Sequence, residues 1–258
     1  MEACNSHVFS LTQAAKEGNI GATVKVLSHA DCDVNAADDE GYSALMWAVK
    51  RVTSESDNYA RIIGEILKHP GIDINAKYSE HRRTALHVAC GSGLTLQITS
   101  DSDRHVTSTV GAAMLLADER CDVNAQDDFG RTALMFAVKN CADAVDVNDD
   151  ADCYVNISKL FIAHPRCDLN VADDFDDTAL IKASAALISA RSRQIIEMLI
   201  ATPRCDVNYG HGTDCDPVLL RIIPFIEQLD DPWCRLFQLL TTRRDGDVTD
   251  EQPLGVGR

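Results

Sequence analysis

Aromatic residues are scarce in this chain: they make up 5% of its 258 residues, although 45% of the chain is hydrophobic. A buried core must therefore be built mainly from Leu, Ile, Val, Ala and Met, which suits packing of helix on helix better than a β-sandwich. Long apolar runs are missing too, since no window reaches the roughly 18 apolar residues of a membrane span. The composition predicts a helical protein that does not insert into membranes.

Positive charge is also in short supply. Lys and Arg number 24 against 40 Asp and Glu, which gives a formal net charge of −16. A field of that sign repels phosphate backbones and anionic lipid surfaces. We therefore expect no nucleic acid as a partner, and we expect another protein with a basic or mixed surface instead.

A short motif, in which an apolar or Cys residue precedes Asp and Asn closes the stretch, recurs five times. Each copy is followed about eight residues later by a second stretch that resembles Ser/Thr-Ala-Leu, more loosely in the last copy. Such self-similarity predicts an array of stacked units, each of which contacts only its neighbours. The motif copies are residues 32–35, 72–75, 121–124, 167–170 and 205–208.

The residues between the motifs have the periodicity of short helices, and Asp and Gly mark the turns. Ser43 can cap the helix that follows it, because its hydroxyl accepts from the free N–H groups of the first turn. We predict an all-α repeat solenoid of helix-turn-helix units joined by β-hairpin-like fingers. The units are about 9–40, 41–81, 82–130, 131–176, 177–214 and 215–244, between a flexible leader, 1–8, and a disordered tail, 245–258.

The ten cysteines do not suggest a disulfide framework or a zinc site. Four of them, Cys32, Cys121, Cys167 and Cys205, stand one place before the motif Asp. Equivalent positions in a stack are a repeat apart and cannot pair, so small buried thiols explain these residues better. No Cys-x-x-Cys pair exists. The N-terminal residues have no charged leader and no apolar segment, so a cytoplasmic or nuclear location is expected.

The units resemble ankyrin repeats. Residues 84–89 read Thr-Ala-Leu-His-Val-Ala, which is nearly the Thr-Pro-Leu-His-x-Ala signature of that family. Residues 124–134, with Asp127, Gly130 and Thr132, match the family's link from one repeat to the next. In the family, a residue at the place of His87 bonds the adjoining loops, and the resemblance implies the same role here.

The array departs from the family in two ways. Successive motif Asn residues lie 40, 49, 46 and 38 positions apart, against about 33 residues in a family repeat. The excess includes polar inserts between the two helices of a unit, which either lengthen both helices or form loops. The fingers also vary, because Asp176 replaces the glycine found at Gly130 and the finger of residues 77–83 has one extra residue. We expect those two fingers to be bent.

The resemblance implies that the chain binds another protein through its finger tips and a concave groove. The groove positions, which follow Thr-Ala-Leu-x, are Trp47, Val88, Phe136 and Lys182. An alternative for Trp47 and Phe136 is that they pack against the next finger. The finger positions with binding potential are Asp39, Glu40, Tyr42, Asp128, Phe129, Arg131, Asp174 and Phe175.

Enzyme chemistry and cofactors are not expected. No Gly-rich phosphate loop, Gly-x-Ser-x-Gly or His-Glu-x-x-His motif is present. Residues 146–152 begin like a calcium loop, but Ala151 stands where that loop needs Gly and Ile157 where it needs Glu. We therefore predict a non-catalytic adaptor or scaffold, a monomer without a metal ion.

Two alternatives stay open. The chain could be a structural or regulatory subunit of a larger assembly that makes contact through its acidic inserts, such as residues 140–152. It could also be a substrate of an asparagine hydroxylase, which the ankyrin resemblance implies for the motif Asn residues. Those are Asn35, Asn75, Asn124, Asn170 and Asn208.

Overall fold

The computed structural model describes residues 10–52, 57–78, 81–91, 109–143, 150–184 and 190–209. The predicted leader, sixth unit and tail lie outside these residues. Within the described residues the chain forms helices in pairs, one pair per unit. The helices are α1 (Leu11–Lys16), α2 (Ile20–Leu27), α3 (Ala44–Arg51), α4 (Asp57–Lys68), α5 (Ala85–Ala89), α6 (Thr109–Leu116), α7 (Ala133–Asp143), α8 (Asp150–Ala163), α9 (Ala179–Ser184) and α10 (Ala190–Ala201).

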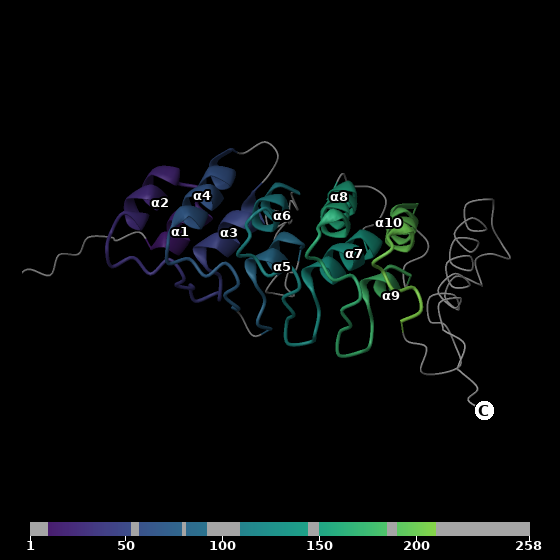
Figure 1. Ribbon diagram of the computed structural model, residues 1–258. Helices are drawn as coiled ribbons and strands as arrows, with labels where there is room; N and C mark the ends of the chain where they lie inside the picture. The colour runs from purple at the N-terminus through teal and green to yellow at the C-terminus, as the bar shows by residue number, and fades with distance from the viewer. Residues whose placement is uncertain are drawn as a thin grey trace, which may run out of the picture.

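The pairs stack in chain order into a single elongated array (Figure 1). The first helix of each pair contacts the first helix of the next pair, and these helices form one row: α1, α3, α5, α7 and α9. The second helices form a parallel row in the same way: α2, α4, α6, α8 and α10. The first helices are enclosed by their neighbours. Helix α3 contacts α1, α4, α5 and α6, and every residue from Ala44 to Val49 is buried. Each of the first helices contains at least two buried alanines, such as Ala44 and Ala48 in α3, and these small side chains let the helices approach closely. The predicted helical repeat solenoid is therefore confirmed.

Side-chain caps begin the helices where the repeated Ser or Thr predicted them. The Ser43 hydroxyl accepts from the N–H of Met46 at 3.3 Å, and the Thr178 hydroxyl accepts from the N–H of Ile181 at 3.4 Å. Each cap satisfies one of the N–H groups that a first helical turn leaves free. The repeated sequence therefore begins the first helix of successive units at equivalent places.

The polar insert of the fourth unit lengthens both of its helices. Helix α7 extends to Asp143 and α8 begins at Asp150. The added part of α7 supplies Asn140, whose Nδ2 donates to the carbonyl of Cys90 at 2.9 Å, just after the end of α5. Of the two arrangements that the sequence allowed for an insert, helix lengthening is the one adopted by the described residues of this unit.

The fingers are short hairpins that project from the row of first helices (Figure 1). Isolated antiparallel bridges join Ala37 to Ser43, Tyr78 to Arg83 and Gln126 to Thr132. Each of these fingers turns through a residue in the left-handed region, Gly41, Arg82 or Gly130. The hairpin-like form that the resemblance implied is confirmed.

The bend expected at Asp176 is wrong. Asp176 takes the left-handed conformation of its counterpart, with φ of 59° against 70° at Gly130. Its N–H donates to the Asp173 carbonyl at 2.9 Å, as that of Gly130 does to Asp127 at 3.0 Å. Aspartate tolerates this conformation better than most residues, so the finger keeps the shared turn at a cost in strain. The finger of residues 77–83 also retains its bridge, and its residues 79–80 lie outside the described part.

Replacing Asp176 by glycine should relieve this strain. We expect Asp176→Gly to raise the free energy of unfolding by about 0.5–1 kcal/mol, measured by urea denaturation. Asp176→Ala is the matched control, since it removes the same charge but keeps a Cβ in the left-handed conformation. An equal gain in both variants would show that charge, and not backbone strain, limits stability at this turn.

Candidate functional site

The five motif turns are joined by their asparagine side chains. Asn75 is typical: its Nδ2 donates to the Arg120 carbonyl at 2.8 Å, and its Oδ1 accepts from the N–H of Asp122 at 2.7 Å. Both partners belong to the next turn of the stack. The motif Asp completes the arrangement, because the Asp73 carboxylate accepts from the N–H of Asn75 at 3.0 Å. Equivalent bonds to the next turn are made by Asn35, Asn124 and Asn170.

These bonds give the motif asparagines a structural role. Each bonded amide uses its donor and its acceptor at once, so the stack is stabilised at every turn that it joins. Hydroxylation of Asn35, Asn75, Asn124, Asn170 or Asn208 stays a prediction. An enzyme acting on the first four would have to draw the side chain out of this arrangement. Mass spectrometry of the native protein, without a shift of about 16 Da on these peptides, would contradict it.

The motif also contains arginines whose role sequence reasoning missed. Arg204 donates through Nη1 to the Cys167 carbonyl at 2.8 Å and through Nη2 to the Ile162 carbonyl at 2.8 Å, at the end of α8. Arg166 makes the same kind of contact to Glu119 and Cys121, and Arg120 to Leu67. A guanidinium at a helix C-terminus satisfies free carbonyls and opposes the helix dipole. The recurrence of Arg directly before Cys in three units was the signal available in the sequence.

Removal of one such arginine should loosen the junction between two units. We expect Arg204→Met to lower the free energy of unfolding by about 1.5–3 kcal/mol, as for hydrogen bonds to a charged group. Hydrogen exchange of α10 measures the effect locally, and Lys159→Met, on the exposed side of α8, is the control. Unchanged exchange in α10 would show that water replaces the guanidinium without loss.

The motif thiols are buried, as predicted for Cys121, Cys167 and Cys205, while Cys32 is partly exposed. Burial raises the pKa of Cys121 and that of Cys167 to about 12, so both are protonated and poor nucleophiles at neutral pH. Cys90, Cys121, Cys141 and Cys167 are buried free thiols. Their part in the motif is packing.

The described residues contain no group of His, Cys, Asp or Glu side chains arranged to hold a metal ion. Of the calcium-like stretch, residues 146–149 lie outside the described part, and Asp152 is in α8. Its carboxylate pairs with Arg191 of α10 at 2.8 Å. The same described part contains no helix long and apolar enough to cross a bilayer.

An aspartate forms the base of three of the fingers. The Oδ1 atoms of Asp38, Asp127 and Asp173 each accept two N–H groups of their own finger, from the residues two and four places on. The second oxygen then faces a different donor in each finger. Asp38 meets the Trp47 indole N–H at 2.6 Å, Asp127 meets Arg131 Nη2 at 2.7 Å, and Asp173 meets Lys182 Nζ at 2.5 Å.

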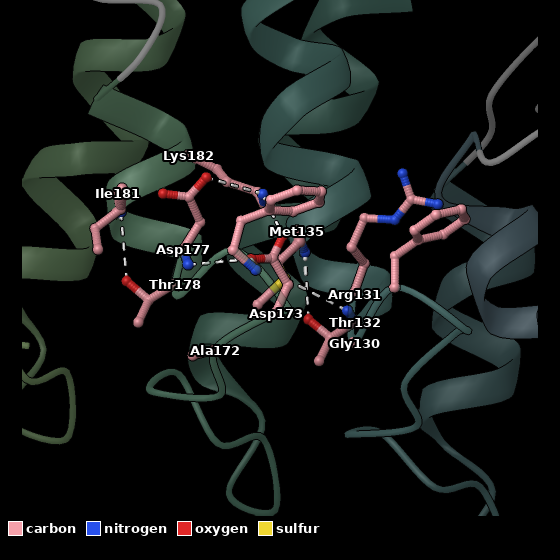
Figure 2. Close-up of polar contacts among 12 residues, drawn as sticks. Gly130, Arg131, Thr132, Met135, Ala172, Asp173, Asp177, Thr178, Ile181 and Lys182 are labelled. Carbon is pink, nitrogen blue, oxygen red and sulfur yellow. Dashed lines mark hydrogen bonds and ion pairs between the residues drawn. The ribbon is translucent and has the colours of Figure 1, made fainter. Parts of the chain in front are cut away.

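Figure 2 shows parts of the fingers of residues 126–132 and 172–178, with Lys182 of α9 extending to Asp173 and Asp177. The Asp127 and Asp173 carboxylates are fully buried. Buried carboxylates of this kind need paired donors, because an isolated buried charge is very costly. The side chains at this place therefore hold the fingers in position.

This arrangement corrects the prediction of an exposed groove. Trp47 is 3% exposed, Val88 5% and Phe136 8%, and the predicted finger residue Tyr42 is 1% exposed. Trp47 is held inward by its bond to Asp38. The alternative that these aromatics pack against fingers fits better, since the guanidinium carbons of Arg83 and Arg131 lie 5.0 and 4.8 Å from the centre of the Phe136 ring. Lys182 is mostly buried with its two carboxylate partners.

The remaining finger residues are at the surface. Phe175 is 72% exposed and Phe129 37%. Arg131 is partly exposed, and its guanidinium carbon lies 4.5 Å from the centre of the Phe129 ring. We call the following set, all of it exposed, the finger row: Asp39, Glu40, Asp128, Phe129, Asp174 and Phe175.

Hydrogen bonds between neighbouring fingers make the later part of this row continuous. The Asp128 N–H donates to the His81 carbonyl at 3.1 Å, and the Asp174 N–H donates to the Phe129 carbonyl at 3.1 Å. The Cβ of any residue replacing Gly130 would come 2.9 Å from the Asp174 nitrogen, so the fingers are in close contact. The row thus presents its side chains from a stiff edge.

Comparisons with known proteins agree with the fold. Residues 11–99 match the family model described as ankyrin repeats, in three copies. An ankyrin repeat domain from Acinetobacter baumannii superposes with a TM-score of 0.65 at 19% sequence identity, over 91% of this chain and 97% of that one. The ankyrin repeat protein EF0377 does so with a TM-score of 0.61 at 20% identity, over 88% of this chain and 100% of its own. The described chain therefore has the ankyrin repeat fold.

Proposed function

We propose that this chain, with its ankyrin repeat fold, is a non-catalytic adaptor or scaffold that binds another protein through the finger row. Ankyrin repeats in general are protein–protein interaction modules. The observation that carries the proposal is the exposure of two aromatic rings, Phe129 and Phe175, on fingers that are hydrogen-bonded side by side. Aromatic residues on a stiff support lose little entropy on binding and are frequent among the residues that dominate interface energy.

The charge of the row favours a partner with a basic or mixed surface. Aspartates precede both rings, at Asp128 and Asp174, and the whole chain carries a formal charge of −16. Complementary charge speeds the encounter of two proteins and opposes wrong partners. We place this binding in the cytoplasm or nucleus, a reducing compartment with which the buried free thiols of Cys121 and Cys167 agree.

The test compares two faces of the stack. A variant with Asp39, Phe129 and Phe175 each changed to Ser should lose the partner that the wild-type chain captures from its native source. The matched control changes Val24 of α2 and Leu160 of α8 to Ser, which removes the two exposed large apolar residues that the described second helices present. Loss of the partner in the control and not in the finger variant would move the binding surface to the second helices.

The acidic inserts remain the competing contact surface. Deletion of all of residues 140–152 would not test this surface alone, because it would also remove the Asn140 contact to Cys90 and the Asp152 pair with Arg191. Deletion of residues 144–149 avoids both contacts. The proposal predicts that this shorter deletion leaves partner capture unchanged, and loss of capture would favour a subunit that docks through its insert.

A further inference from the structure

Two successive fingers have the same backbone and different charges around their exposed rings. Phe129 and Phe175 each follow the finger-base aspartate by two places, and their N–H groups donate to it at 3.0 Å in both cases. Arg131 and Asp177 each follow it by four places and also donate to it at 3.0 Å. The finger of residues 172–178, here the fourth finger, therefore has a carboxylate at the place where the finger of residues 126–132, here the third finger, has a guanidinium.

The third finger shows how such a ring is covered. The Arg131 guanidinium lies over Phe129 at 4.5 Å while it pairs with Asp127. In the fourth finger, Lys182 of α9 neutralises the buried Asp173 instead. Phe175 is left 72% exposed. The cation–ring contacts found among the described residues involve Tyr42, Trp47, Phe129 and Phe136, and not Phe175.

The carboxylates next to Phe175 have few cationic partners among the described residues. Asp174 and Asp176 are exposed and belong to none of the ion pairs found among the described residues. Asp177 shares Lys182 with Asp173, at 3.3 Å. An apolar partner surface would bury these carboxylates without compensation, which is costly. A planar cation satisfies both the ring and the carboxylates, and arginine does so better than lysine because it can stack and pair at once.

We propose that Phe175, with Asp174 and Asp176, binds an arginine side chain of the partner protein, which takes the position that Arg131 occupies over Phe129. This inference rests on the proposed function, since it names the chemistry that the finger row recognises. A single exposed phenylalanine needs no explanation by itself. The repeat-to-repeat comparison is what identifies the missing group as a guanidinium.

The experiment uses the full chain and three blocked peptides, Gly-Ser-Arg-Ser-Gly and its lysine and citrulline counterparts. Citrulline keeps the shape of arginine without the charge. In NMR spectra with labelled phenylalanine, the arginine peptide should shift the Phe175 ring signals saturably. The citrulline peptide should bind about two- to five-fold more weakly, the range that a cation–π contact at an exposed site supplies. The lysine peptide should bind more weakly than the arginine peptide and more tightly than the citrulline peptide, because it keeps the charge but cannot stack and pair at once.

Two variants make the test specific. Asp177→Arg should abolish peptide binding, because the chain's own guanidinium then covers Phe175 as Arg131 covers Phe129. Phe175→Leu should weaken binding by the same two- to five-fold, and Phe129→Leu, the matched control, should leave it unchanged. Thermal unfolding confirms that each variant is folded, and a variant that binds like the wild type despite Asp177→Arg overturns the proposal.

Other outcomes also overturn it. They are equal binding of the citrulline peptide, no shift of Phe175 with any peptide, and Phe175 shifts that depend on protein concentration alone, which would indicate a second copy of this chain as the occupant. If the arginine peptide does not bind but the variant with Asp39, Phe129 and Phe175 changed to Ser loses the partner, only this inference is wrong and the proposed function stands. If the triple variant keeps its partner, the proposed function fails whatever the peptide does.

Discussion

Replacing Lys182 by methionine should lower the free energy of unfolding by about 3–5 kcal/mol, the range seen when one partner of a buried ion pair is removed. Methionine keeps most of the length of the lysine stem, so the packing of α9 is largely preserved. The loss comes from the Asp173 carboxylate, which has no exposed area and would keep its two finger N–H donors but lose the Nζ at 2.5 Å. A buried anion without its counter-charge is the costly species.

Two further variants separate charge from packing. Lys182→Arg keeps a cation near Asp173 and should recover most of the stability. The double variant Asp173→Asn with Lys182→Met removes both charges and should be clearly more stable than Lys182→Met alone. A loss below about 1 kcal/mol in the single variant would show that the pair behaves like an exposed one.

The measurement should be local as well as global, because repeat arrays can unfold in parts when one interface is weakened. Urea denaturation gives the overall loss, and hydrogen exchange of α9 and α10 shows where it falls. We expect exchange to rise in these two helices and in the finger that contains Asp173, while α3 and α4 stay protected. This variant also tests the predicted binding role of Lys182, since partner capture can be measured at low temperature where the variant is folded.

The fold was predictable because the motif specifies local interactions that repeat. Asp73 and Asn75 form a turn within their own unit, and Asn75 then bonds the next turn. Ser or Thr places the start of the following helix at a fixed distance. Each of these contacts lies within one unit or joins it to the next unit, so five copies in register were enough to predict the stack.

The exposure of the groove positions was not predictable from a single copy, because it depends on a pair of residues. The donor that faces the finger-base aspartate is an indole at Asp38, a guanidinium at Asp127 and an ammonium at Asp173. Because the donor differs in each finger, no single residue type in the sequence identifies the buried pair. The pairing is visible only when units are compared. In the finger of residues 77–83, Tyr78 replaces the aspartate and its hydroxyl donates to the Asn35 carbonyl at 2.5 Å; the groove position of the helix that follows is the apolar Val88.

The buried His87 should make the third repeat sensitive to acid. Burial, the largest cause, lowers the pKa of His87 from 6.5 to about 4. Its Nε2–H donates to the Arg131 carbonyl at 3.0 Å, and its Nδ1 lies 3.2 Å from the Thr84 nitrogen, whose N–H it accepts. A second proton would occupy the acceptor that Thr84 uses. The neutral imidazole therefore joins its own helix to the neighbouring finger, as the resemblance implied.

The direction of the pH dependence follows from this shift. Above about pH 6.5 His87 is neutral in both the folded and the unfolded chain, so its full contribution is present. As the pH falls from 6.5 toward 4, the unfolded chain binds a proton that the folded chain does not, and stability is lost. The total loss is about 3 kcal/mol, of which about 2 kcal/mol falls between pH 6.5 and 5, above the range where most carboxylates titrate.

A variant without the imidazole isolates this contribution. Met46, Met135 and Ile181 stand at the equivalent place in the second, fourth and fifth units, so His87→Met introduces a side chain that the fold already uses there. The variant loses the bond to Arg131 and should be less stable at pH 7, yet its unfolding free energy should fall by about 2 kcal/mol less than that of the wild type between pH 6.5 and 5. Histidine-labelled NMR provides the direct check. A His87 signal that titrates near 6.5 in the folded chain would mean that the imidazole reaches water, and the acid sensitivity would then have to come from the carboxylates alone.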